Sequence, residues 1–339
     1  TVDFAKMGYD DKSVYDMIAE GNTEGVFQLE SGGMTAFMKN LKPGCFEDVV
    51  AGISLYRPGP MDSIPKYIEN KKNPSKIKYV TPELASILDV TYGCLVYQEQ
   101  VMQIVRNLAG YSFGRADLVR RAMSKKKTEE MLAEKQIFIH GKIDEDGNIE
   151  IPGCLRNGIT EEAAEVIFAD METFAQYAFN KSHAAAYAVL AYETGWLKKH
   201  YPVEFMAAVM STEMYNIDRL SLFINEAREK DIEILVPDVS LSDAEFKVEG
   251  NGIRFGLTAI KGIGRNFVMD IMEERREPFV SYEDFVYRMK QYGLNRKQLE
   301  SLVLSGSLDK FPGNRQEKFL SIDKTLEWAT KKYEAEEDL

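Results

Sequence analysis

Apolar residues recur at the helical spacing of three to four positions through most of the first 230 residues. The clearest case is the segment 98–109, where Val101, Met102, Val105 and Leu108 would share one face of a helix. Similar periods, bounded by capping residues or proline, predict further helices at about 10–21, 31–41, 46–53, 114–123, 128–138, 160–174, 182–199 and 202–210. The pattern therefore predicts a mainly α-helical protein.

The pattern changes near residue 231, where short alternating segments replace the helical periods. Residues 233–236 are typical of a strand, and residues 246–255 alternate around a Gly-Asn-Gly turn, which predicts a β-hairpin. Short helices follow to the end. We therefore place a boundary at about 230–240 and predict a multi-helical domain at residues 1–235 and a small α+β region at residues 236–339. Within the first, the polar stretch 142–151 predicts a surface turn.

The composition is that of an ordinary water-soluble globular protein, with 45% hydrophobic and 28% charged residues. No stretch approaches the roughly 18 apolar residues of a membrane span, and no signal segment opens the chain. Cys45, Cys94 and Cys154 form neither a CxxC pair nor a disulfide framework. These features favour a cytoplasmic protein without a membrane partner. The start at Thr1 rather than Met suggests an excised or processed chain.

The charge is unevenly distributed along the chain. The net charge is −12, and a uniformly acidic protein would repel nucleic acid. Between Arg106 and Lys127, however, seven Lys or Arg residues accompany a single Asp, which gives this segment a local charge of +6. A concentrated basic segment in an acidic chain indicates contact with a polyanion at that place.

Two adjacent arginines, Arg120 and Arg121, lie on a predicted helix within this basic segment. Asp117 precedes them by three and four positions, so its carboxylate can orient either guanidinium. Arginine suits phosphate because its planar fork donates paired, charge-assisted hydrogen bonds. Lys125 and Lys126 follow and would extend the same positive field. A solvated basic face is the plain alternative, which the acidic background disfavours.

A second candidate site lies at Asn180-Lys181-Ser182-His183, where a long helix is expected to begin with Ser182 as its N-cap. The start of a helix presents free N–H groups and the positive end of its dipole, both of which suit phosphate. Lys181 adds a full charge. The alternative is an ordinary capped helix with an exposed lysine and a structural histidine.

A third candidate is the run Lys261-Gly262-Ile263-Gly264-Arg265 between two apolar segments that we expect to be helical. It resembles a helix-hairpin-helix, in which glycines let backbone N–H groups reach a DNA phosphate without reading bases. A plain connection between helices is the alternative. A dinucleotide-binding loop is disfavoured because the third glycine and the strand-to-helix context are missing.

Common catalytic motifs are missing from the sequence. It has no GxxxxGK[ST] loop, no HExxH and no GxSxG. Its paired carboxylates lie near predicted helix starts or in the acidic tail, and none forms the Asp-x-Asp on a strand that two-metal phosphoryl transfer needs. We therefore expect no catalytic residue, metal site or bound cofactor in this chain.

Seven blocks along the chain together resemble the α subunit of bacterial DNA polymerase III, the C-family of replicative DNA polymerases. The blocks are Gly25-Val-Phe-Gln-Leu-Glu-Ser31, Arg57-Pro-Gly-Pro-Met61, Tyr97-Gln-Glu-Gln-Val-Met102, Asp117-Leu-Val-Arg-Arg-Ala-Met123 with Lys125-Lys-Lys127, Phe179-Asn-Lys-Ser-His183, Tyr201-Pro-Val-Glu-Phe-Met-Ala-Ala-Val-Met210 and Ile260-Lys-Gly-Ile-Gly264. They follow the order of that family. The resemblance covers nearly the whole chain.

This resemblance implies a fingers domain followed by a helix-hairpin-helix region, with two groups of binding residues. The group expected to bind the incoming dNTP is Arg120, Arg121, Lys125, Lys126, Lys181, His183, Tyr97, Gln98 and Gln100. The group expected to contact primer–template DNA is Arg57, Lys261, Gly262, Gly264 and Arg265. The arginines would contact phosphates, and His183 would lie beside the sugar and exclude a 2′-hydroxyl.

The same resemblance places the catalytic Mg²⁺ ions in a palm domain that this chain lacks, so the fragment alone should be inactive. Its partners would be the other domains of the α subunit and other replicase subunits, with the sliding clamp bound through a region absent here. Two alternatives stay open. A non-enzymatic helix-hairpin-helix module would need Lys261 and Arg265 but not Arg120, Arg121 or His183. An acidic protein-interaction scaffold would show no salt-dependent DNA binding.

Overall fold

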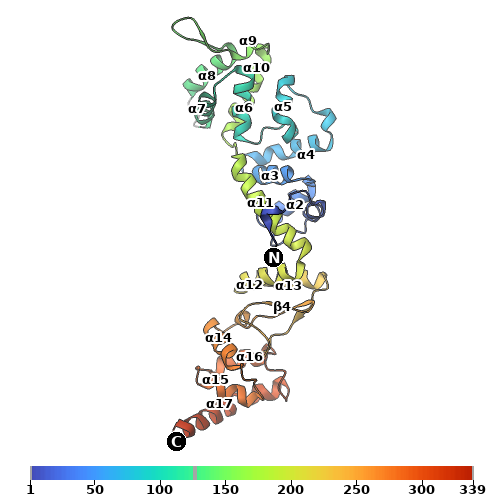
Figure 1. Cartoon of the computed structure of the whole chain (residues 1–339), viewed down its shortest axis with the longest axis vertical. Coiled ribbons are helices and arrows are strands. Elements are labelled where there is room, and N and C mark those ends of the chain that lie inside the picture. Colours follow the sequence, from blue (N-terminus) through green and yellow to red (C-terminus); the bar gives the residue numbers. More distant parts are fainter. Residues whose placement is uncertain (1, 125–127, 338–339) are drawn as a thin grey trace. The chain divides into compact units, whose positions relative to one another are not determined.

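The structure is a computed structural model, and it describes residues 2–124 and 128–337 (Figure 1). Helices dominate, and the strands form only a two-stranded and a three-stranded sheet among the described residues. This confirms the predicted fold class, mainly α with a small α+β region. The chain divides into two compact units, Thr1–Lys199 and His200–Leu339.

The first unit is built from helices joined by short turns, several of which are 3₁₀ helices. Its 3₁₀ helices are η1 (Phe4–Lys6), η2 (Pro60–Ser63), η3 (Pro74–Lys76), η4 (Pro82–Leu84) and η5 (Asp89–Thr91). Its α-helices are α1 (Lys12–Ala19), α2 (Gly32–Leu41), α3 (Phe46–Leu55), α4 (Ile64–Lys72), α5 (Ala85–Leu88), α6 (Gln98–Ala109), α7 (Phe113–Ser124), α8 (Thr128–His140), α9 (Gly153–Arg156), α10 (Glu161–Ala175) and α11 (Lys181–His200).

Polar side chains fix the starts of several of these helices, as the sequence predicted. Asp11, Ser31 and Thr160 each accept a hydrogen bond from a backbone N–H in the first turn of α1, α2 and α10. The predicted cap of α11 was wrong. That helix begins one residue earlier than expected, and the side chain of Asn180, not Ser182, accepts the N–H of His183 at 2.9 Å.

Two hydrophobic cores stabilise the first unit. The first joins α1, α2 and α3 to the middle of α11, where Ala184, Ala188 and Ala191 are fully buried. These small side chains let the backbone of α11 approach the other helices closely. The second core joins α6, α7, α8 and α10, and Phe138 and Phe168 are among its buried residues. Each buried side chain of this size contributes about 1.5–3 kcal/mol.

The chain passes between the two cores at two segments that pair with each other. Tyr97 and Phe179 form a parallel β-bridge, and the backbone N–H of Gln98 donates to the backbone carbonyl of Phe179 at 2.9 Å. Helix α6 begins directly after the first segment, and α11 begins directly after the second. We call this pairing the Tyr97–Phe179 crossing. It brings the N-terminal ends of two helices to the same place.

The prediction of a surface turn at residues 142–151 needs refinement. The segment is a small antiparallel hairpin of β1 (Lys142–Ile143) and β2 (Ile149–Ile151), with Gly147 at positive φ in its turn. Most of its residues are exposed, so the segment does lie on the surface. Its strands are too short and too polar for a period of two to show in the sequence.

The second unit combines helices with a three-stranded sheet. Its helices are α12 (Pro202–Thr212), α13 (Ile217–Glu229), η6 (Leu257–Ala259), α14 (Arg265–Glu274), α15 (Tyr282–Lys290), α16 (Arg296–Leu304) and α17 (Arg315–Glu337). Strands β4 (Lys247–Glu249) and β5 (Gly252–Arg254) form the predicted hairpin, and β3 (Ile234–Leu235) pairs with β5 in parallel. One core packs the sheet against α12 and α13, and another joins α14 to α17.

No helix in the described part of the chain is long and apolar enough to cross a membrane. Whether the functional boundary lies at residues 235–236 stays a prediction.

Candidate functional site

The Tyr97–Phe179 crossing gathers most of the side chains predicted to bind a nucleotide. The first turn of α6 supplies Gln98, α7 supplies Arg120, and the start of α11 supplies Lys181 and His183. The loop after α3 adds Arg57. These residues come from four separate parts of the sequence, and the contacts below connect them into one group.

Arg57 and His183 both contact the ring of Phe179. The Arg57 guanidinium lies 4.1 Å from the ring centroid and donates to the carbonyl of Tyr177 at 2.9 Å. Burial of the guanidinium lowers the pKa of Arg57. The exposed imidazole of His183 packs edge-on against Phe179 and against Tyr187, with centroids 5.5 and 4.4 Å apart. Arg57 therefore stabilises the segment around Phe179. His183 packs against two rings and is otherwise exposed to solvent.

Lys181 is contacted by two carboxylates and one aromatic ring. Its backbone N–H lies 3.2 and 3.1 Å from the two oxygens of Glu99. Its ammonium lies 3.2 Å from Glu47 Oε2 and 5.3 Å from the centroid of the Tyr97 ring. About a third of the lysine side chain stays exposed. The backbone of Lys181 is thus fixed at the crossing, while its ammonium lies beside a carboxylate and stays accessible to a ligand.

Arg120 connects α7 to the crossing. Its Nη1 donates to the side-chain oxygen of Gln98 at 3.1 Å, and its Nη2 donates to Asp117 at 2.8 Å. The other oxygen of Asp117 lies 2.8 Å from Nε of the more exposed Arg121. The hydrogen bond from Arg120 lowers the pKa of Asp117, and Arg121 adds to the effect. Asp117 therefore orients both guanidiniums, as the spacing in the sequence predicted.

Two predicted nucleotide contacts, Tyr97 and Gln100, have buried side chains. The Gln100 oxygen accepts the backbone N–H groups of Val96 and Tyr97, and its amide donates to Thr91 at 2.8 Å. Only 3% of Gln100 and 1% of Tyr97 is exposed. In this conformation the two residues stabilise the crossing through buried contacts. Their direct contact with a base pair stays a prediction that this packing disfavours.

The glycine-rich run of the second unit lies in an exposed turn. Gly262 has φ +89°, which favours glycine, and α14 begins directly after Gly264. The described part of the chain offers no acceptor to the amides of either glycine. Lys261 is exposed, and Arg265 pairs with Glu245 at 2.9 Å. Only the short η6 precedes this turn, where we expected a helix, because β5 ends just before it.

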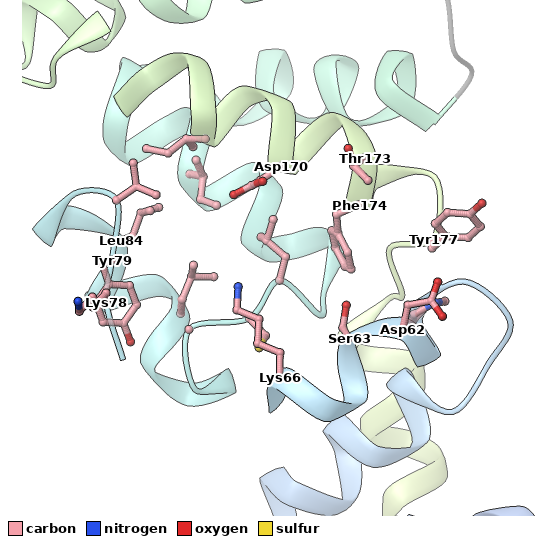
Figure 2. Close-up of a pocket in the computed structure, with 18 of the residues that line it drawn as sticks. Asp62, Ser63, Lys66, Lys78, Tyr79, Leu84, Asp170, Thr173, Phe174 and Tyr177 are labelled. Carbon is pink, nitrogen blue, oxygen red and sulfur yellow. The ribbon is translucent and has the colours of Figure 1, made fainter. Parts of the chain in front are cut away.

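A pocket of about 420 Å³ lies elsewhere in the first unit, between residues of α4 and of α10 (Figure 2). The side chains of Lys66 and Asp170 point into it from opposite sides. Tyr177, whose carbonyl binds Arg57, also lines it. None of the predicted site residues that the structure describes is among its lining residues. The pocket is therefore distinct from the group at the crossing.

The structure thus brings together Arg57, Gln98, Arg120, Lys181 and His183, with Arg121 beside them. Lys125 and Lys126 lie outside the described residues, so their predicted role is untested. Lys261, Gly262, Gly264 and Arg265 form a separate group in the second unit.

Sequence reasoning missed Phe179, Glu47 and Glu99, which make the central contacts of the group. Phe179 falls within a block that carried the family resemblance, so its position in that block was a usable signal. Glu47 and Glu99 lie in the first turns of α3 and α6, where an acidic residue is commonly explained by the helix dipole. Nothing local distinguishes them from ordinary helix-start acids.

The chemistry available at the crossing is electrostatic. Three cations and the N-terminal ends of α6 and α11 converge there, which suits a polyanion such as a phosphate chain. Across residues 2–124 and 128–337, no group of three or more His, Cys, Asp or Glu side chains could hold a metal ion. The arrangement has the charge and the donor groups that binding of a phosphate group would require.

Two protein families and several known proteins are similar to this chain in sequence. Residues 1–146 match the family of bacterial DNA polymerase III α subunit finger domains, and residues 231–318 match a helix-hairpin-helix motif family. The chain is 45% identical to the DNA polymerase III subunit alpha of Thermus aquaticus over 97% of its residues. Identity to the same subunit is 41% in Deinococcus radiodurans, over 96% of the chain, and 40% in Bacillus subtilis, over 97%.

The chain covers 26%, 24% and 28% of those three relatives, so it spans about a quarter of their length. The finger-domain match includes Arg57, Gln98, Arg120 and Glu47, and the helix-hairpin-helix match includes the glycine-rich turn. The chain therefore belongs to the bacterial DNA polymerase III α subunits, as a segment with their finger domain and helix-hairpin-helix motif.

Proposed function

We propose that this chain is the fingers segment of a replicative DNA-directed DNA polymerase, which binds the phosphates and sugar of an incoming dNTP and the primer–template DNA. The convergence of Arg120, Lys181 and His183 at the Tyr97–Phe179 crossing carries the proposal. The relatives named above support it, because each is named as a subunit of a DNA polymerase.

In this proposal the arginines, the lysine and the histidine have different roles. Arg120 and Arg121 donate charge-assisted hydrogen bonds to phosphate oxygens, and Asp117 keeps their forks in place. Lys181 adds a point charge at the start of α11. His183 presents its free edge to the sugar, and the rings of Phe179 and Tyr187 limit its movement. Lys125 and Lys126, which lie outside the described residues, would add their charge to the same field.

The proposed reaction of the parent polymerase joins the primer 3′-oxygen to the α-phosphorus of the dNTP. The bond between the α-phosphorus and the bridging oxygen breaks, pyrophosphate leaves, and the 3′-hydroxyl loses its proton. Mg²⁺ would supply activation of the hydroxyl and charge neutralisation. The described residues do not fit such a metal site, so this chain contributes positioning and charge. We propose that the fragment alone is inactive.

The second unit would bind the duplex backbone. The unpartnered amides of Gly262 and Gly264 and the exposed Lys261 can contact phosphate without reading a base. Other domains of the α subunit and other replicase subunits would be its protein partners, with the sliding clamp bound by a region outside this chain. A cytoplasmic location follows from this role.

The test is single-nucleotide incorporation by the parent polymerase with the Arg120→Ala/Arg121→Ala change. We expect kcat/KM for the dNTP to fall by about 100- to 10,000-fold, because each of the two arginines would lose a charge-assisted hydrogen bond of about 1.5–3 kcal/mol. Arg106→Ala/Lys135→Ala removes two charges from α6 and α8, outside the contacts of the crossing, and should change kcat/KM little. Unchanged incorporation by the first variant would remove the phosphate-binding role and favour a helix-hairpin-helix module or a scaffold.

A further inference from the structure

The ion pair between Lys181 and Glu47 has an unusual feature. The ammonium lies 3.2 Å from Glu47 Oε2, yet this oxygen is enclosed and receives no hydrogen bond from any described residue. The attraction between the two groups is therefore Coulombic, without the directional bond that would fix it. The remainder of both side chains is partly exposed, 35% for Lys181 and 44% for Glu47.

The second carboxylate, Glu99, contacts Lys181 in a different way. Its two oxygens lie 3.1 and 3.2 Å from the backbone N–H of Lys181, so it binds the start of α11 and not the ammonium. Moving the ammonium away from Glu47 would leave this backbone contact in place. The ammonium also lies 5.3 Å from the centroid of the Tyr97 ring, which is a second contact independent of Glu47.

We infer that Glu47 is a displaceable counter-ion for Lys181, which a triphosphate replaces on binding, and that Glu99 is the positioning residue that fixes the start of α11. The inference rests on the proposed function, because it takes Lys181 as a phosphate-binding residue. Displacement leaves the enclosed Glu47 oxygen without a counter-charge, which opposes binding. A ligand with several negative charges can offset this cost, whereas a single phosphate cannot. Glu47 therefore makes the site selective for a triphosphate over a single phosphate.

These roles predict opposite effects on KM when Glu47 and Glu99 are substituted. Glu47→Gln removes the competitor for the ammonium, so KM for the dNTP should fall about 3- to 10-fold, and inhibition by pyrophosphate should strengthen by a similar factor. Glu99→Ala loosens the start of α11, so KM should rise. Glu99→Gln keeps an acceptor for the N–H of Lys181 and should restore KM to near the unmodified value.

The experiment measures single-nucleotide incorporation and pyrophosphate inhibition in the parent polymerase. Glu165→Gln is the matched control, because Glu165 lies 3.2 Å from Lys135 in a pair of similar exposure. It should leave KM and pyrophosphate inhibition unchanged. Glu47→Asp keeps the negative charge at the start of α3 but withdraws it from the ammonium, and it should also lower KM. A lower KM only with Gln would indicate a general charge effect and overturn the inference.

Lys181→Ala separates this inference from the proposed function. If Lys181→Ala leaves KM unchanged, Lys181 does not bind the nucleotide and both proposals fail at this residue. If Lys181→Ala raises KM while Glu47→Gln leaves it unchanged or higher, only the counter-ion role is overturned. In the double variant Glu47→Gln/Lys181→Ala, the gain from Glu47→Gln should disappear, because the two residues act through one contact. If Glu47→Gln still lowered KM in the absence of Lys181, that result would also contradict the counter-ion role.

Discussion

The imidazole of His183 is held between the rings of Phe179 and Tyr187 with its outer edge exposed. Under the proposed function this edge excludes a 2′-hydroxyl by steric contact, so His183→Ala should admit ribonucleotides. We expect the preference for dNTP over rNTP to fall on the order of 10-fold, the range of pocket-based discrimination. Competition between the two nucleotides in the parent polymerase measures this ratio. His140→Ala, at an exposed histidine of α8, is the control, and equal ratios in both variants would disprove sugar sensing.

Gln98 and Gln100 are close in sequence but have opposite environments. Gln100→Ala would leave the buried N–H groups of Val96 and Tyr97 without their acceptor, which should cost about 2–4 kcal/mol of unfolding free energy. Gln98→Ala should change the unfolding free energy by about 0.5 kcal/mol or less. Denaturant unfolding of both variants provides the comparison. Similar losses in the two would show that the packing around Gln100 is not as described.

At this scale the sequence predicted the types of residue that meet at the site and the local pairing of Asp117 with Arg120 and Arg121, but not the partners that are distant in sequence. The helical period does place Gln100 on the buried face of α6 with Ile104 and Leu108, so its burial could have been anticipated. The partners of Lys181 could not. Glu47 is distant in sequence, and its proximity depends on how α3 packs against α11 in the first core.

On helix α7, Asp117 fixes the arrangement of Arg120 and Arg121. The pKa of Asp117 lies below its ordinary value of 3.8, chiefly because Arg120 donates a hydrogen bond to the carboxylate. Its contribution to stability is therefore full above that value and is lost as the pH falls through the lower, folded pKa. The difference in unfolding free energy between the chain and its Asp117→Asn variant should be constant above about pH 5, and it should shrink as the pH falls below 3.8 and through the lower pKa of the folded state. Denaturant titrations followed by circular dichroism measure it, and a constant difference would contradict the assignment.

The sequence predicted those elements whose formation depends on neighbouring residues. The period of apolar residues gave α6 at its observed bounds, and the Gly-Asn-Gly turn gave the hairpin of β4 and β5. The parallel pairing of β3 with β5 and the Tyr97–Phe179 crossing were not predicted, because each joins strands through tertiary packing and not through a turn. The cap of α11 was misplaced by two residues because Asn180 and Ser182 are both good capping residues.

For the chain as a whole, the net charge of −12 makes any DNA binding dependent on a few local contacts. Lys261→Ala should weaken binding of the parent polymerase to primer–template DNA regardless of sequence, and it should reduce the slope of log K against log salt by about 1. Lys247→Ala, which removes an equal charge from β4, should leave the slope unchanged. Fluorescence anisotropy at several salt concentrations measures both. Equal slopes for the two variants would place the duplex contact elsewhere.

The Tyr97–Phe179 crossing also determines when the site can form during synthesis. Lys181 and its partner Glu99 are 82 residues apart in sequence. Closing a flexible loop of that length costs about 4 kcal/mol of chain entropy, which the packing of the two cores and the contacts at the crossing must offset. A nascent chain that ends before Phe179 already carries Arg57, Gln98 and Arg120, but it lacks the segment that joins them. Under the proposed function, the nucleotide site can therefore form only after residues 179–183 have been synthesised, later than the other segments that contribute to it.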